Sequence, residues 1–149
     1  MKRDDRIELL RRVWLFERCA RKELTLLASN ATPLQVGPGT VLAREGDLGR
    51  EFFVLVSGKA VVSRNGVEVG VLGPGNFFGE MALLDREPRV ATVATTEPTE
   101  VLVLTTQAFT SVVDAMPSVD RKMLTVLAGR LRDIEARYLP ADERHLAPH

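Results

Sequence analysis

Residues 59–72, KAVVSRNGVEVGVL, are typical of two short strands joined by a tight turn. Asn65 and Gly66 lie between the β-rich runs VVSR and VEVGVL. Both residues tolerate a positive φ, which a two-residue hairpin turn requires. This stretch therefore predicts an antiparallel β-hairpin.

The same pattern continues on both sides of this hairpin. Ten glycines from position 37 to position 79 interrupt the chain at short intervals, and β-rich runs lie among them and after them. Many short strands with frequent glycine turns predict a mainly β fold, an antiparallel sandwich or barrel of the jelly-roll kind. The expected strands are Thr40–Ala43, Phe52–Val56, Lys59–Arg64, Val67–Leu72, Val90–Ala94 and Thr99–Thr105.

Helical periodicity precedes this β region, within residues 4–30. Apolar residues recur there at helical spacing, and an interruption at Phe16–Cys19 indicates two helices separated by a tight bend. Asp4 or Asp5 is the expected N-cap of the first helix, because a short acidic side chain can accept from free amides at a helix start.

Helical periodicity returns at 107–138, where Pro117 separates a short helix from a long one that runs to about Tyr138. The long helix carries a heptad seam of apolar residues at spacings of 3, 4, 3 and 4. The seam could pack on its own barrel, but we favour self-association into a homodimer through residues 118–138. Its residues are Leu124, Leu127, Leu131, Ile134 and Tyr138.

Length and composition indicate one globular domain. The 149 residues suffice for a single hydrophobic core, and we expect a domain at 1–138, with its barrel at 31–105, followed by a flexible tail at 139–149. No apolar run approaches the length of a membrane span, and the N-terminus lacks a secretory signal. The single cysteine, Cys19, is interpreted as a core residue, and we expect a cytoplasmic location.

The charge distribution disfavours nucleic acid as a partner. The net charge is zero, and residues 30–117 carry six basic and ten acidic side chains, a net charge of −4. Neutralising many phosphates requires a basic stripe, and the sequence has none. An anion bound by the acidic middle of the chain must therefore be held by local groups.

One segment, residues 77–93, carries such groups. Gly79 precedes Glu80 and a short apolar stretch that is typical of a single helical turn, and Arg89 follows. The free amides at the start of such a turn suit one phosphate, and Arg89 could add a bidentate contact to it. The carboxylate of Glu80 suits a sugar hydroxyl instead. A phosphate site, a hydroxyl site and an apolar wall together indicate a nucleotide.

The run FGEMALLDREPRVATV, residues 78–93, also resembles the phosphate-binding cassette of cyclic nucleotide-binding domains. This family includes kinase regulatory subunits and catabolite activator proteins. The resemblance extends over residues 10–138. It implies a receptor that catalyses nothing itself, binds cyclic AMP or, less favoured, cyclic GMP, needs no cofactor, and signals by movement of its C-terminal helix.

The resemblance implies a role for each matching residue. Glu80 would accept from the ribose 2′-OH, Arg89 would bind the cyclic phosphate, and backbone amides around Ala82 and Val90 would complete the phosphate contacts. Ile134 and Tyr138, on the long helix, would form a lid over the base. The expected ligand-binding residues are Gly79, Glu80, Met81, Ala82, Arg89, Val90 and Ala91.

Two positions depart from the family pattern. Val90 stands where relatives that favour cyclic GMP often carry a threonine, and its side chain cannot hydrogen-bond to guanine, so cyclic AMP is the favoured ligand. Arg50 stands where kinase regulatory subunits carry an aspartate that supports the cassette arginine, and Glu51 lies beside it as a possible substitute.

Several alternatives remain open. Arg89 and Glu80 could form a purely structural salt bridge, Glu80 could only cap its turn, or the domain could be a degenerate, ligand-free protein-interaction module. A metalloenzyme is disfavoured because both histidines, His145 and His149, lie in the tail. DNA binding through a helix-turn-helix is disfavoured because only 11 residues follow Tyr138. We expect an unknown protein effector in trans and no membrane partner.

Overall fold

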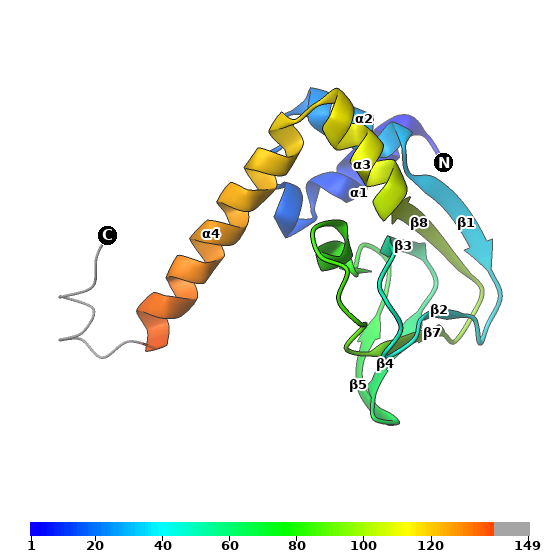
Figure 1. Ribbon diagram of the computed structural model, residues 1–149. Coiled ribbons are helices and arrows are strands. Elements are labelled where there is room, and N and C mark those ends of the chain that lie inside the picture. The colour runs from blue at the N-terminus through cyan, green and yellow to red at the C-terminus, as the bar shows by residue number, and fades with distance from the viewer. Residues whose placement is uncertain (139–149) are drawn as a thin grey trace.

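The computed structural model describes residues 1–138 as a two-sheet β-sandwich with helices gathered at one end (Figure 1). This arrangement confirms the predicted mainly β fold with N-terminal helices and a long C-terminal helix. The strands are β1 (Thr32–Val36), β2 (Val41–Ala43), β3 (Glu51–Ser57), β4 (Ala60–Arg64), β5 (Val67–Leu72), β6 (Phe77–Phe78), β7 (Thr92–Thr95) and β8 (Thr99–Thr105). The helices are α1 (Arg3–Arg11), α2 (Arg21–Ser29), α3 (Thr106–Ala115) and α4 (Ser118–Tyr138), with 3₁₀ turns η1 (Trp14–Phe16) and η2 (Glu80–Leu83).

Two antiparallel four-stranded sheets make up the sandwich. One has the strand order β1-β8-β3-β6 and the other β2-β7-β4-β5. The predicted hairpin is confirmed, because β4 pairs with β5 across Asn65 and Gly66, whose φ angles are 53° and 77°. The register places Ala60 opposite Leu72 and Arg64 opposite Val67.

Strand β3 lies between two hydrophobic cores, which explains why its sequence is apolar without alternation. Phe52 and Val54 face the core that the helices cover, and Phe53 and Leu55 face a smaller core inside the sandwich. The ring of Phe53 stacks on that of Phe78 at 4.9 Å between centroids. This stacking holds β6, and therefore the segment that follows it, against the sandwich.

Two strands were not expected, and one lies elsewhere than expected. The edge strand β1 contains Pro33, which an edge position tolerates, and it pairs along its length with β8. Strand β6 has only two residues. Strand β7 begins at Thr92, so Val90 and Ala91 lie in the preceding loop, and the predicted start of the expected strand Val90–Ala94 was wrong.

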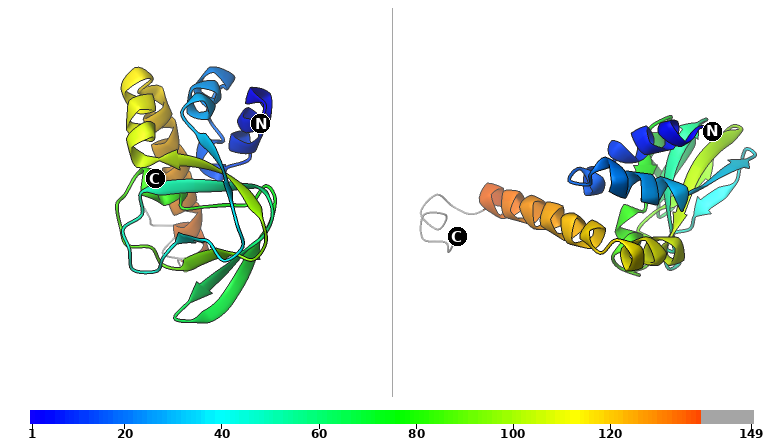
Figure 2. Two further views of the ribbon diagram at one scale, coloured as in Figure 1. Left: turned by 90° about the vertical axis from the view of Figure 1, so that its right-hand side faces the viewer. Right: turned by 90° about the horizontal axis from the view of Figure 1, so that it is seen from above.

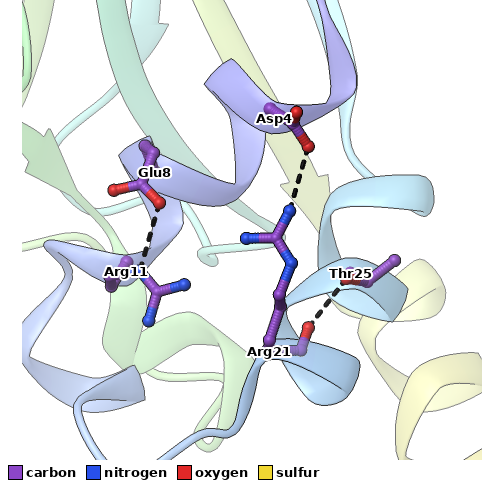
Figure 3. Close-up of polar contacts among 5 residues, drawn as sticks. All are labelled: Asp4, Glu8, Arg11, Arg21 and Thr25. Carbon is purple, nitrogen blue, oxygen red and sulfur yellow. Dashed lines mark hydrogen bonds and ion pairs between the residues drawn. The ribbon is translucent and has the colours of Figure 1, made fainter.

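One surface ion pair joins the two N-terminal helices, and further polar contacts lie within each helix. Arg21 of α2 donates to Asp4 of α1 at 3.0 Å, Arg11 pairs with Glu8, and the Thr25 hydroxyl donates to the Arg21 carbonyl (Figure 3). The expected N-cap was wrong. The capping position is Lys2, and both Asp4 and Asp5 lie inside the first turn, where their charges still oppose the helix dipole favourably.

Helix α4 begins beside α2 and α3 and runs away from the sandwich, as Figures 1 and 2 show. Its first half is held by the buried side chains of Val119, Met123 and Val126. Of the predicted seam, Leu127 packs against the helical core. The other four seam residues, which we call the exposed seam, do not pack on the sandwich: Leu124, Leu131, Ile134 and Tyr138.

The described residues contain no helix with the length and apolar character that crossing a bilayer requires. The predicted flexible tail, 139–149, lies outside the described residues, and so do His145 and His149.

Candidate functional site

A cavity of about 440 Å³ opens between the β4–β5 hairpin and residues 78–93. Cavities of a few hundred Å³ are the usual size of small-molecule sites. All seven residues predicted from the sequence line it: Gly79, Glu80, Met81, Ala82, Arg89, Val90 and Ala91. The structure therefore gathers the predicted set around one cavity.

The backbone at Gly79 explains the need for glycine at the start of this segment. Gly79 has a φ of 82°, in the left-handed region that favours glycine. A Cβ built there would lie 2.5 Å from Nη1 of Arg89 and 2.8 Å from the Glu51 carbonyl oxygen. Any other residue would therefore displace the arginine or the backbone of β3.

The turn η2 uses one amide that was expected to bind phosphate. The Ala82 N–H donates to the Gly79 carbonyl oxygen at 3.0 Å, which closes the turn. The capping position of this turn is Gly79, and the hydrogen bond that the Glu80 side chain accepts comes from Trp14. The phosphate contact predicted for the Ala82 amide would thus have to share or replace an existing hydrogen bond.

Arg89 is held in place from the side of β3. Its side chain is only 10% exposed, and Nη2 donates to the Glu51 carbonyl oxygen at 2.7 Å. The Glu51 carboxylate lies 4.0 Å away, which supplies an acidic partner where Arg50 replaces the aspartate of the family pattern. Burial lowers the pKa of Arg89, and the Glu51 charge opposes that shift.

Arg89 also lines the cavity. Within residues 1–138, neither Nε nor Nη1 of Arg89 donates a hydrogen bond to the protein. Gly49 lies on its other side, and a Cβ there would lie 3.2 Å from Nε. Two glycines thus flank a guanidinium that is anchored through one nitrogen, which is a suitable arrangement for binding an anion.

Glu80 is engaged by a residue that the sequence did not connect to it. Oε1 of Glu80 accepts from Nε1 of Trp14 at 3.1 Å. No ion pair joins Arg89 to Glu80 among residues 1–138, so the structural salt bridge considered above is not formed there. Trp14 is half-buried, between the helical core and Glu80.

The remaining cavity wall is mainly apolar. Met81 and Val90 are exposed at the cavity, Val90 with an exposed fraction of 71%. Sequence reasoning missed Arg64, whose Nε donates to the Val90 carbonyl oxygen at 3.2 Å across the cavity mouth. The other lining residues are Ala43, Gly49, Val62, Leu72, Phe78, Asp85, Glu87, Pro88 and Val93.

The expected lid residues lie away from this cavity. Ile134 and Tyr138 are 49% and 82% exposed, and neither lines the cavity. Helix α4 would have to move for either side chain to reach a ligand (Figure 1). The lid role stays a prediction about another placement of α4.

The described part of the chain offers little for metal or thiol chemistry. No group of three His, Cys, Asp or Glu side chains within residues 1–138 is arranged to hold a metal ion. Cys19 is buried, and burial together with the nearby Glu23 charge raises the pKa of its thiol to about 11. A thiol with that pKa is a weak nucleophile at neutral pH.

Known proteins resemble this chain in sequence and in fold. The chain is 34% identical over 136 residues to a cyclic AMP receptor protein of Thermus thermophilus, covering 87% of this chain and 63% of that protein. It is 38% identical over 92 residues to a cGMP-dependent protein kinase of Eimeria tenella, covering 62% of this chain and 9% of the kinase. The chain thus spans less than two thirds of either relative.

Among solved structures, the N-terminal domain of a transcriptional regulator from Streptomyces coelicolor superposes with a TM-score of 0.80 at 26% identity. It covers 89% of this chain and 99% of that domain. The family description "Cyclic nucleotide-binding domain" matches residues 33–116, more than half of the chain and all of the 78–93 segment. The chain therefore belongs to the cyclic nucleotide-binding domain family.

Proposed function

We propose that this domain is a receptor for cyclic AMP, in which Arg89 binds the cyclic phosphate and Glu80 accepts from the ribose 2′-OH. The observation that carries the proposal is that one apolar cavity is lined by both groups. Arg89 is anchored to Glu51 through Nη2, and its Nε and Nη1 make no hydrogen bond within residues 1–138. The receptor itself would catalyse no reaction.

The magnitudes are sufficient for a useful affinity. A micromolar ligand requires about 8 kcal/mol of binding free energy. Hydrogen bonds to charged groups contribute roughly 1.5–3 kcal/mol each. Two contacts from Arg89, one from Glu80 and the apolar wall could supply much of this before the entropic cost of binding is subtracted.

Val90 supports cyclic AMP over cyclic GMP. Its side chain is exposed at the cavity and has no hydroxyl with which to hydrogen-bond to guanine. Of the two relatives described above, one is named for cyclic AMP and the other for cyclic GMP, so their names are compatible with either ligand.

Titration with three nucleotides tests the proposed ligand. We expect cyclic AMP to raise the melting temperature, cyclic GMP to raise it less, and linear AMP to leave it unchanged. Linear AMP carries a more highly charged phosphate that does not fit a site for a cyclic monoanion. If neither cyclic nucleotide bound in calorimetry, the result would favour the alternative of a ligand-free protein-interaction module.

The exposed seam supports a homodimer, which we also propose. Leu124, Leu131, Ile134 and Tyr138 form an apolar row on α4 that no described residue of the same chain covers. Burying such a row against a second copy would remove it from water. The unknown effector in trans and the absence of a nucleic-acid partner stay predictions.

Sedimentation tests the seam. Leu131→Glu places a charge in the apolar row, so we expect the variant to sediment as a monomer at concentrations where the unaltered chain is a dimer. Thr125→Glu is the matched control, because Thr125 is also exposed on α4 but lies outside the seam. Equal masses for all three proteins would rule the seam out as the interface.

A further inference from the structure

Trp14 connects the candidate site to α4. Its indole Nε1 donates to Oε1 of Glu80 at 3.1 Å, and the guanidinium carbon of Arg130 lies 4.0 Å from the centroid of its ring. The three side chains come from η1, η2 and α4, which are far apart in the sequence. A residue that lines the cavity is therefore joined to the long helix through one aromatic ring.

The indole reaches Glu80 through one donor and one oxygen. Tryptophan has a single N–H, which Oε1 of Glu80 accepts, and a carboxylate can accept at both oxygens, so the ligand hydroxyl competes with the indole where it donates to the same Oε1. Its ring face attracts the Arg130 guanidinium by a cation–π interaction. One side chain thus makes two attachments of different kinds, one at its edge and one at its face.

Arg130 also lies at the end of the part of α4 that contacts the other described elements. Before it, Val126 is buried and Leu127 packs on the helical core. After it, every residue from Leu131 to Tyr138 is exposed. The stack on Trp14 is therefore the last of these attachments before α4 projects from the molecule (Figure 1).

We propose that Trp14 is a relay that competes with the ligand hydroxyl for Glu80 and so ties occupancy of the cavity to the placement of α4. The inference rests on the proposed function, in which Glu80 accepts from a ribose hydroxyl. A hydroxyl that donates to Glu80 weakens the indole bond, and the freed indole no longer holds Arg130 at its present place.

Linkage fixes the sign of the effects. Within this proposal, the arrangement in which Trp14 joins Glu80 and Arg130 is the one that a hydroxyl bound to Glu80 disfavours. A ligand that binds better to the other state shifts the balance toward it, and any change that weakens the Trp14 arrangement must raise the apparent affinity for the ligand. Trp14 and Arg130 are thus positioning residues that act through Glu80.

The hydrogen bond from Trp14 to Glu80 is tested by nuclear magnetic resonance. Trp14 is the single tryptophan of the chain, so its indole N–H gives one assignable signal. In Glu80→Ala we expect that signal to move upfield and its hydrogen to exchange faster, because the acceptor is gone. An indole signal unchanged in Glu80→Ala would overturn the relay.

The coupling to ligand is tested by calorimetry with cyclic AMP. Trp14→Phe keeps an aromatic ring but removes the N–H, and we expect it to bind about three- to tenfold more tightly, the effect of one hydrogen bond. Arg130→Ala should tighten binding in the same direction. Arg132→Ala is the matched control, since it removes an equal charge from α4 without contact to Trp14.

A double-mutant cycle separates the relay from a merely structural role. With Ala at position 80, Trp14→Phe should have no effect on cyclic AMP affinity. An equal effect in both backgrounds, or weaker binding by Trp14→Phe in the Glu80 background, would overturn the relay. If the unaltered chain did not bind cyclic AMP at all, the proposed function would fail, a result distinct from normal binding that is insensitive to Trp14→Phe.

Discussion

Replacing Arg89 with alanine is expected to weaken cyclic AMP binding by about tenfold or more, because the phosphate would lose its charge-assisted partner. The Arg89 side chain is 10% exposed, and within residues 1–138 only its Nη2 donates a hydrogen bond, to the Glu51 carbonyl oxygen. Among residues 1–138, Arg64 is the one other arginine or lysine that lines the cavity. The loss would be measured by isothermal calorimetry.

Two further variants test whether the loss of affinity is specific to the Arg89 guanidinium. Arg86→Ala is the matched control, because Arg86 belongs to the same segment and is exposed but does not line the cavity. Arg89→Lys keeps the charge but loses the planar fork that flanking glycines accommodate, so it should restore only part of the affinity. Unchanged affinity in Arg89→Ala would remove the phosphate role from this residue.

Replacing Lys122 with methionine is expected to lower the free energy of unfolding by about 3 kcal/mol, near the lower end of what breaking a buried ion pair costs. Glu23 of α2 has no exposed surface, and it accepts from Ser118 at 2.6 Å, from the Ala20 amide at 2.7 Å and from Lys122. The variant leaves a buried carboxylate without its cation. Lys122 itself is partly exposed, which keeps the cost moderate.

The pH dependence gives an independent check on the same cluster. Burial by itself raises the pKa of Glu23, but the hydrogen bonds from Lys122, Ser118 and Ala20 outweigh it, and the net pKa lies below the ordinary 4.5. A lowered carboxyl pKa contributes stability above pH 4.5 that is lost as the pH falls from there through the folded-state pKa. The difference between the unaltered chain and Lys122→Met should therefore shrink below pH 4.5.

Urea unfolding at several pH values measures both effects. Lys22→Met is the control, because Lys22 is exposed on α2 and forms no ion pair within the described residues. A Lys122→Met variant as stable as this control would show that Glu23 does not depend on Lys122. Because Glu23 joins α2 to the start of α4, the cluster also fixes where α4 leaves the helical layer.

Much of the fold follows from local chemistry. The Asn65–Gly66 turn predicted the β4–β5 hairpin because only residues that tolerate positive φ form it, and glycine spacing predicted the other short strands. Strands β1 and β6 escaped prediction, since one includes a proline and the other has two residues, and each is defined by the partner strand it pairs with.

The residues of the candidate site also include some that the sequence predicted and some that it did not. The seven residues that line the cavity within 79–91 could be named in advance because they are near neighbours in the chain and match one motif. Arg64 and Gly49 could not, since they reach Val90 and Arg89 only through the packing of other strands. Glu51 was named as a possible support for Arg89, but its carbonyl contact with that side chain depends on the packing of β3. The lid residues were named from resemblance alone, and the structure places them outside the cavity.

The sequence by itself determined the turn types, the strand-rich middle, the helical ends and the chemical groups of the cavity, because each depends on residues within one short segment. Only the tertiary structure decided that Trp14 binds Glu80, that Glu51 holds Arg89, and that Glu23 anchors α4. These contacts span 66, 38 and 95 or more residues of sequence. No local period or turn preference encodes such pairs, since they form only when separate elements pack together and exclude water.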